Sequence, residues 1–145
     1  MGSYNIESIL EHRFPMLLID GIISVEPMQS CHAFKILNLD EWFFSGHFPG
    51  NPIMPGSLQI EAFTQAVALP LLIAGDRGHK KSTLVLFAVD RVRFYKQVLP
   101  GDKFEIKVRI ETIAMGMVSA SVVGLVGAEK VSECKIAYKI KENAI

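Results

Sequence analysis

A histidine in a rigid loop is the first residue in this chain that could carry chemistry. His47 follows an aromatic pair and precedes a stretch rich in proline and glycine, namely Pro49, Gly50, Pro52, Pro55 and Gly56. Proline fixes φ and glycine permits left-handed geometry, so we expect this loop to hold one shape. A neutral imidazole is a suitable general base at physiological pH. The alternative is a loop histidine that only hydrogen-bonds to the backbone.

The second candidate is a carboxylate in an apolar helical stretch. Glu61 is the one charged residue between Leu58 and Ala74, and its neighbours in sequence are Ile60, Ala62 and Phe63. Apolar surroundings desolvate a carboxyl group and favour its protonated form, which can donate a proton. The alternative is a glutamate on the exposed stripe of an amphipathic helix, but that stripe carries almost no other charge. His47 and Glu61 therefore outline an acid–base site.

The composition indicates one globular domain over residues 1–145. Half of the residues are hydrophobic, the net charge is zero and the pI is near 6.9, so a general nucleic-acid-binding role has no electrostatic support. No signal peptide is apparent, and the longest apolar run, 66–74, is far shorter than the roughly 20 residues of a membrane-spanning helix. Cys31 and Cys134 form no disulfide framework or zinc pattern. These features predict a cytoplasmic protein with reduced thiols.

The elements that position the two candidates follow from the apolar pattern. A buried helix is predicted from Pro55 onward, with a kink or an end at Pro70. Residues 103–111 alternate strictly between apolar and charged, which is typical of a strand with one buried face. The other β-rich stretches are 16–25, 30–37, 83–98, 117–126 and 131–140. About five or six successive strands and one long helix predict an α+β fold, with a curved antiparallel sheet wrapped around the helix.

At residues 46–56, GHFPGNPIMPG, the chain closely resembles the β-hydroxyacyl-acyl-carrier-protein dehydratases of type II fatty acid synthesis. The resemblance extends to the opening motif at 12–20, the active-site helix at 58–65, and a third block at 87–102. It implies a hot-dog fold. It also implies a homodimer with two composite active sites, and such dimers are commonly assembled further into a trimer of dimers.

The same resemblance implies that His47 is the base and Glu61 the acid of a lyase. Such an enzyme converts a (3R)-hydroxyacyl thioester to the trans-2-enoyl thioester without a cofactor. His47 would remove the α-proton, and Glu61 of the other subunit would protonate the departing hydroxyl. Three departures from the family pattern are Gly21, Pro70 and the charged loop 75–82.

Five further residues are candidates for substrate binding. The amides at Gly56, at the helix start, would polarise the thioester carbonyl, although a glycine there also permits the turn. Gln65, one helical turn after Glu61, is placed to hydrogen-bond it. Phe48, Phe87 and Tyr95 are candidates for lining the acyl tunnel, although aromatic residues in strands are more often core residues.

The implied partner is acyl carrier protein with its phosphopantetheine arm. A basic collar for this acidic partner would come from Arg77, His79, Lys80, Lys81, Arg91, Arg93 and Lys96. The histidines show no metal-ligand spacing, so we predict no metal site.

Two other functions remain open at this point. A hot-dog thioesterase would use a carboxylate and water to hydrolyse the thioester, releasing a free thiol. A non-catalytic acyl-binding protein would bind ligand without turnover, but the presence of both His47 and Glu61 argues against it.

Overall fold

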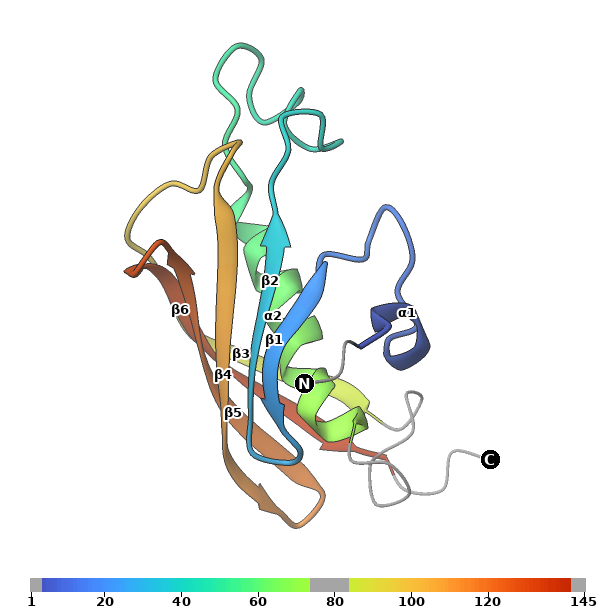
Figure 1. Ribbon diagram of the computed structural model, residues 1–145. Coiled ribbons are helices and arrows are strands. Elements are labelled where there is room, and N and C mark those ends of the chain that lie inside the picture. Colours follow the sequence, from blue (N-terminus) through green and yellow to red (C-terminus); the bar gives the residue numbers. More distant parts are fainter. Residues whose placement is uncertain (1–3, 74–83, 142–145) are drawn as a thin grey trace.

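The computed structural model describes residues 4–73 and 84–141, in which one long helix lies against the concave face of a curved sheet (Figure 1). The elements are α1 Ile6–Ile9, β1 Gly21–Glu26, β2 Ser30–Ile36, α2 Gly56–Leu72, β3 Leu84–Phe94, β4 Lys103–Ala114, β5 Met117–Val126 and β6 Glu129–Ile140. The strand order is β1-β2-β4-β5-β6-β3, and all neighbours are antiparallel. The predicted α+β architecture is confirmed.

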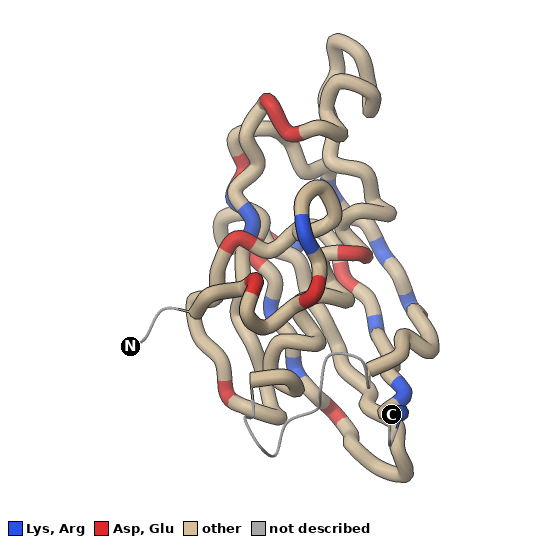
Figure 2. Tube along the Cα trace, turned by 90° about the vertical axis from the view of Figure 1, so that its right-hand side faces the viewer, with Lys and Arg blue, Asp and Glu red and all other residues tan. Residues whose placement is uncertain are grey.

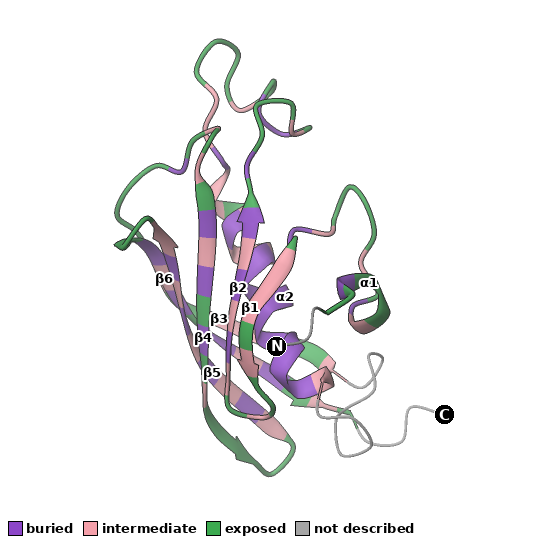
Figure 3. Ribbon diagram, in the orientation of Figure 1, coloured by how far each residue is buried: buried purple, intermediate pink, exposed green. Residues whose placement is uncertain are grey.

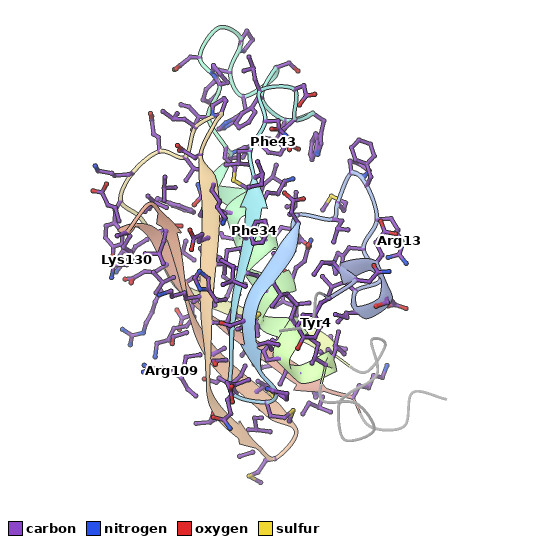
Figure 4. All side chains as sticks on the ribbon, in the orientation of Figure 1. Tyr4, Arg13, Phe34, Phe43, Arg109 and Lys130 are labelled. Atoms are coloured by element: carbon purple, nitrogen blue, oxygen red, sulfur yellow. The ribbon has the colours of Figure 1, made fainter. Side chains whose placement is uncertain are left out.

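The alternating pattern of β4 places its apolar side chains under the helix. Phe104, Ile106 and Val108 are buried, whereas the alternating residues Lys103, Lys107 and Arg109 are exposed. Since side chains alternate across a sheet, one face of β4 packs on α2 and the other faces water. Figure 3 shows the buried residues concentrated on α2 and on the strands that cover it, and Figure 4 shows side chains filling the space between them.

Helix α2 is enclosed along most of its length, as its uniformly apolar sequence predicts. Every residue from Ala62 to Leu71 is buried. The helix continues past Pro70 and ends at Leu72, so the predicted end lies two residues too early. Pro70 stands in the last turn, where its carbonyl has no partner within the helix and accepts a hydrogen bond of 2.9 Å from the amide of Met28, in the β1–β2 turn.

The prediction of a strand from residue 16 is wrong for residues 16–20. The amides of Met16 and Leu17 both bond to the carbonyl of Arg13, at 2.8 and 3.1 Å, which forms a turn. Leu18 and Ile19 are buried all the same. Their apolar side chains enter the core from a loop attached to α2, and the strand begins only at Gly21.

Strand β3 forms one edge of the sheet and carries large exposed apolar side chains. Val85, Leu86 and Phe87 are all exposed, Phe87 to 63%. The predicted β-rich stretch 83–98 is shorter in the structure, because after Phe94 the chain leaves the sheet. The amide of Met54 then bonds to the carbonyl of Val98 at 2.8 Å, which ties this segment to the loop before α2.

Charged residues of both signs are spread over several elements, as Figure 2 shows. Across residues 4–73 and 84–141, no helix is both long and apolar enough to cross a membrane.

Candidate active site

The loop between β2 and α2 fixes the orientation of His47. The imidazole Nδ1 lies 2.9 Å from the carbonyl oxygen of Ile53, and the amide of Ile53 donates to the carbonyl of His47 at 2.7 Å. A carbonyl oxygen can only accept, so Nδ1 carries the hydrogen and Nε2 of the neutral ring keeps a free lone pair. His47 therefore does make the backbone hydrogen bond that was the alternative interpretation of this residue. The same hydrogen bond leaves Nε2 unprotonated and available as a base.

The side chain of His47 lines a cavity of about 420 Å³ at the start of α2. The cavity is lined by His47, Ile53, Met54, Gly56, Gln59, Phe94, Tyr95, Lys96 and Gln97. The first amides of a helix have no acceptor within the helix and carry its positive dipole end, which suits an oxygen that gains negative charge. A Cβ at Gly56 would lie 2.7 Å from the ring of Phe94, so a larger residue here would require that ring to move.

Glu61 lies on another side of α2, outside the residues that line this cavity. Its Oε2 accepts a hydrogen bond of 3.0 Å from Nε2 of Gln65 and lies 3.5 Å from Nε2 of His12. Its side chain is 30% exposed. The expectation of wholly apolar surroundings is therefore wrong, because the opening motif brings a histidine and part of the 16–18 loop to this position.

Gln65 holds Glu61 in place, as the helical spacing predicts. The side chain is completely buried, its Oε1 accepts from the amide of Leu18 at 2.9 Å, and its Nε2 donates to the carbonyl of Met16 at 2.7 Å. An amide N–H can only donate and a carbonyl can only accept, so the two ends of the glutamine amide cannot be exchanged. Its second N–H is therefore the one directed at Glu61.

A comparison with family models adds the decisive observation: the model described as a FabA-like domain matches residues 10–135, which include both candidate residues and all six strands except the end of β6. The chain belongs to the FabA-like family. Family membership predicted from the motifs at 12–20, 46–56, 58–65 and 87–102 is thereby confirmed.

Curated relatives of this FabA-like chain are named 3-hydroxyacyl-acyl-carrier-protein dehydratase FabZ. The protein from Ralstonia nicotianae is 38% identical and the match covers 99% of this chain and 90% of the relative. The protein from Caldicellulosiruptor bescii is 39% identical, with 95% of this chain and 99% of the relative covered. The dehydratase activity in these names is a hydro-lyase activity, the class that the sequence predicts for this chain.

Solved structures show the same fold at low identity. The dehydratase heterocomplex ApeI:P from Xenorhabdus doucetiae is similar with a TM-score of 0.80 at 16% identity, covering 97% of this chain and 93% of that one. The virulence protein Cj0977 from Campylobacter jejuni is similar with a TM-score of 0.70 at 14% identity, covering 97% and 99%. The hot-dog fold predicted from the resemblance is confirmed.

The three aromatic candidates of this FabA-like chain lie in different places. Phe48 stacks on the imidazole of His47, with ring centroids 4.1 Å apart, and is half exposed. Tyr95 lines the cavity and donates a hydrogen bond of 2.6 Å to Glu133, which raises the pKa of Tyr95. Phe87 lies on the edge strand, is exposed, and is not among the residues that line this cavity.

Sequence reasoning missed two residues near the candidates. Gln59 lines the cavity, and its position three residues after Gly56 on the helix was the signal for it. His12 approaches Glu61, and its place in the opening motif was noted without a role. Within the described residues, no group of three or more His, Cys, Asp or Glu is arranged to hold a metal ion.

The basic collar is only partly within the described residues. Arg77, His79, Lys80 and Lys81 lie outside them. Arg91 and Arg93 are exposed on β3, whereas Lys96 lines the cavity and pairs with Glu129 at 2.8 Å. Lys130, labelled in Figure 4, lies with its Nζ 5.4 Å from the ring centroid of Tyr95 and adds a second basic group on the Tyr95 side of the cavity.

Proposed function

We propose that this chain is a (3R)-hydroxyacyl-acyl-carrier-protein dehydratase, which eliminates water from a β-hydroxyacyl thioester to give the trans-2-enoyl thioester. The observation that carries the proposal is the orientation of His47, whose Nε2 is left free as a base in a cavity at the start of α2. The names of the full-length relatives support the choice of substrate.

In this proposal His47 removes the α-proton of the bound thioester. The proton moves to Nε2, and the thioester carbonyl gains negative charge, which the amides at Gly56 stabilise. The hydrogen bond from Nδ1 to the carbonyl of Ile53 stabilises the resulting imidazolium, since a charged donor makes the stronger hydrogen bond.

Glu61 is the proposed acid that releases the hydroxyl as water. Because Gln65 donates to Oε2 of Glu61, a proton on this carboxyl group is best placed on Oε1. The electron pair from the α-carbon forms the double bond, the bond from the β-carbon to oxygen breaks, and the hydroxyl departs with the proton from Oε1. A protonated imidazole and an ionised carboxylate remain, and returning the proton completes the cycle.

The two groups act together in a dimer under this proposal. Within one chain Glu61 lies outside the cavity of His47, so the acid for that cavity must come from a second copy. The unpaired edge of β3 and the exposed Val85, Leu86 and Phe87 favour a second copy beside this strand, because such edges readily pair with another strand. A dimer related by a twofold axis would hold two equivalent composite sites.

The proposed partner is acyl carrier protein, whose prosthetic arm would enter beside Tyr95 and Lys96. Arg91, Arg93 and Lys130 are the described basic groups that could steer an acidic partner to this side. We also propose a cytoplasmic location, which agrees with Cys31 and Cys134 being free thiols.

Two variants test this proposal directly. We expect His47→Ala and Glu61→Gln each to lower kcat for hydration of crotonyl thioester by about 10²–10⁴-fold, the contribution typical of one general acid or base. Matched controls are His32→Ala and Glu105→Gln, which make the same changes in an ion pair between β2 and β4, away from the site. Rates are followed from the absorbance of the enoyl thioester.

Full activity in either site variant would refute the assigned role of that residue. Release of free thiol from an acyl thioester, without hydration of the crotonyl substrate, would instead indicate the thioesterase. If the wild-type chain binds the crotonyl thioester and the acyl thioester saturably but turns over neither, it is an acyl-binding protein.

A further inference from the structure

Gln59 lies in the wall of the cavity that contains His47 and carries an enclosed, unpaired polar atom. Its side chain is only 3% exposed, and Oε1 has no hydrogen-bond partner among the described residues. A buried amide oxygen without a partner is destabilising by roughly 1–3 kcal/mol. Because Gln59 lines the cavity, a half-turn of its terminal amide, which exchanges Oε1 with Nε2, would bring Oε1 to a ligand there.

The position of Gln59 on α2 separates it from Glu61. Residues two apart on a helix do not face each other, whereas residues three apart do. Gln59 therefore shares a side of the helix with Gly56, in the cavity of its own subunit, and Glu61 faces the 16–18 loop. One helix thus offers a polar amide to one site and a carboxyl group to another.

We infer that the Gln59 amide binds the β-hydroxyl of the substrate and makes Gln59 a specificity-determining residue. The thioester carbonyl can only accept, so it cannot satisfy Oε1, and the acyl chain has no other donor near the reacting carbons. A hydroxyl both donates and accepts, so it pairs with either end of the amide. This inference rests on the proposed dehydration.

The contact also fits the elimination. When the hydroxyl donates its hydrogen to Oε1 of Gln59, its lone pairs stay free for the proton from the acid. The hydroxyl then leaves as water after the bond from the β-carbon breaks. The enoyl product has no hydroxyl, so the contact discriminates between substrate and product.

The test compares ligands with and without the hydroxyl in wild type and Gln59→Met, which keeps the length of the side chain and removes its polar atoms. The measurements are KM for (3R)-hydroxybutyryl pantetheine, KM for crotonyl pantetheine, and the inhibition constant of butyryl pantetheine. In wild type we expect KM for the hydroxyacyl ligand to be about tenfold below the inhibition constant of the saturated one. In Gln59→Met these two values converge.

The control variant is Leu58→Met, which places the same residue one position earlier and outside the cavity lining. It should retain the wild-type preference. In Gln59→Met, KM for crotonyl pantetheine should change by less than about twofold. The value of kcat/KM should fall by the same factor for dehydration and for hydration, because a catalyst cannot change the equilibrium constant of the reaction.

An unchanged preference for the hydroxyl in Gln59→Met would overturn this inference and leave the proposed dehydratase intact. Equal binding of hydroxybutyryl and butyryl pantetheine by the wild-type chain would also overturn the inference. That result does not depend on the folding of any variant. Absence of crotonyl hydration by wild type would instead refute the proposed function, and the inference with it.

Discussion

At the scale of single residues, Gln65 connects the chemistry to the fold. It is buried on α2, and its three hydrogen bonds join Glu61 to Met16 and Leu18 of the opening loop. Replacing it leaves the buried amide of Leu18 and the partly buried carbonyl of Met16 without this partner, and it frees the Glu61 side chain. One substitution should therefore affect both stability and turnover.

We expect Gln65→Met to lower the free energy of unfolding by about 1–3 kcal/mol, because the buried amide of Leu18 is left unpaired. It should also lower kcat by about tenfold with little change in KM, because Glu61 is positioned less well. Urea denaturation and initial rates measure the two effects. The same change at the exposed Gln29 should alter neither, and wild-type stability in Gln65→Met would contradict the account.

The sequence indicates the candidate residues and the contact of Gln65 with Glu61, but not the surroundings of His47 and Glu61. The loop motif and helical spacing identified His47, Glu61 and the Gln65 contact. The partner of Nδ1, the carbonyl of Ile53, depends on how the loop closes, and His12 reaches Glu61 from 49 positions earlier in the sequence. Gly21, which departs from the family pattern, is explained by the ring of Phe34, since a Cβ there would lie 2.7 Å from it.

At the scale of elements, the pairing of β5 with β6 contains a polar group that gains nothing from burial. Ser132 is fully buried, and its Oγ has no hydrogen-bond partner in the described part of the chain. It lies opposite Gly124, where a Cβ would approach Ser132 Oγ at 2.6 Å and the ring of Phe104 at 2.7 Å. The hydroxyl therefore lies in a tightly packed layer between the strands.

We expect Ser132→Ala to raise the free energy of unfolding by about 1 kcal/mol, because it removes a buried unpaired hydroxyl. The midpoint of thermal unfolding should rise by roughly 3–4 °C for a chain of this size. Ser121→Ala, on the half-buried outer side of β5, is the matched control and should leave the midpoint unchanged. A lower midpoint for Ser132→Ala would show that the hydroxyl has a partner.

Elements with a regular period were predictable and irregular ones were not. The alternation in 103–111 identifies β4 and its buried face, because a strand with one wet face repeats every two residues. Residues 16–19 are equally apolar, yet they form a turn and a buried loop, since burial by α2 requires no strand geometry. Composition alone does not separate these two outcomes.

At the scale of the whole molecule, folding protects two thiols from ionisation. Burial raises the pKa of Cys31 from 9.0 to about 12, and burial together with Glu133 raises that of Cys134 to about 12. Above pH 9 the unfolded chain loses these protons while the folded chain retains them. The resulting stability is fully present below pH 9 and is lost as the pH rises toward 12.

We therefore expect the free energy of unfolding, measured with urea, to fall steadily between pH 9 and pH 11. Each thiol contributes a slope of at most about 1.4 kcal/mol per pH unit. In the double variant Cys31→Ala, Cys134→Ala, the free energy of unfolding should fall less steeply with pH than in wild type. At pH 8 the variant should be less stable than wild type. Equal slopes in the two proteins would contradict the assignment of the effect to the thiols.

The account as a whole depends on two copies of the chain sharing each site. Neither the edge of β3 nor the separate surroundings of His47 and Glu61 could be predicted in detail from the sequence. The family resemblance implied only a dimer with composite active sites. A dimer formed along β3 would cover the exposed Val85, Leu86 and Phe87 and bring a second Glu61 to each cavity. That arrangement can be tested by combining two inactive chains.

The most direct measurement mixes His47→Ala and Glu61→Gln chains, unfolds and refolds them together, and follows crotonyl thioester hydration. A mixed dimer contains one intact site, with His47 from one chain and Glu61 from the other. Since half of the dimers are mixed and half of their sites are intact, activity should return to about one quarter of the wild-type value. Each variant refolded alone should stay inactive. Activity that does not return in dimers shown to be mixed would contradict the shared site.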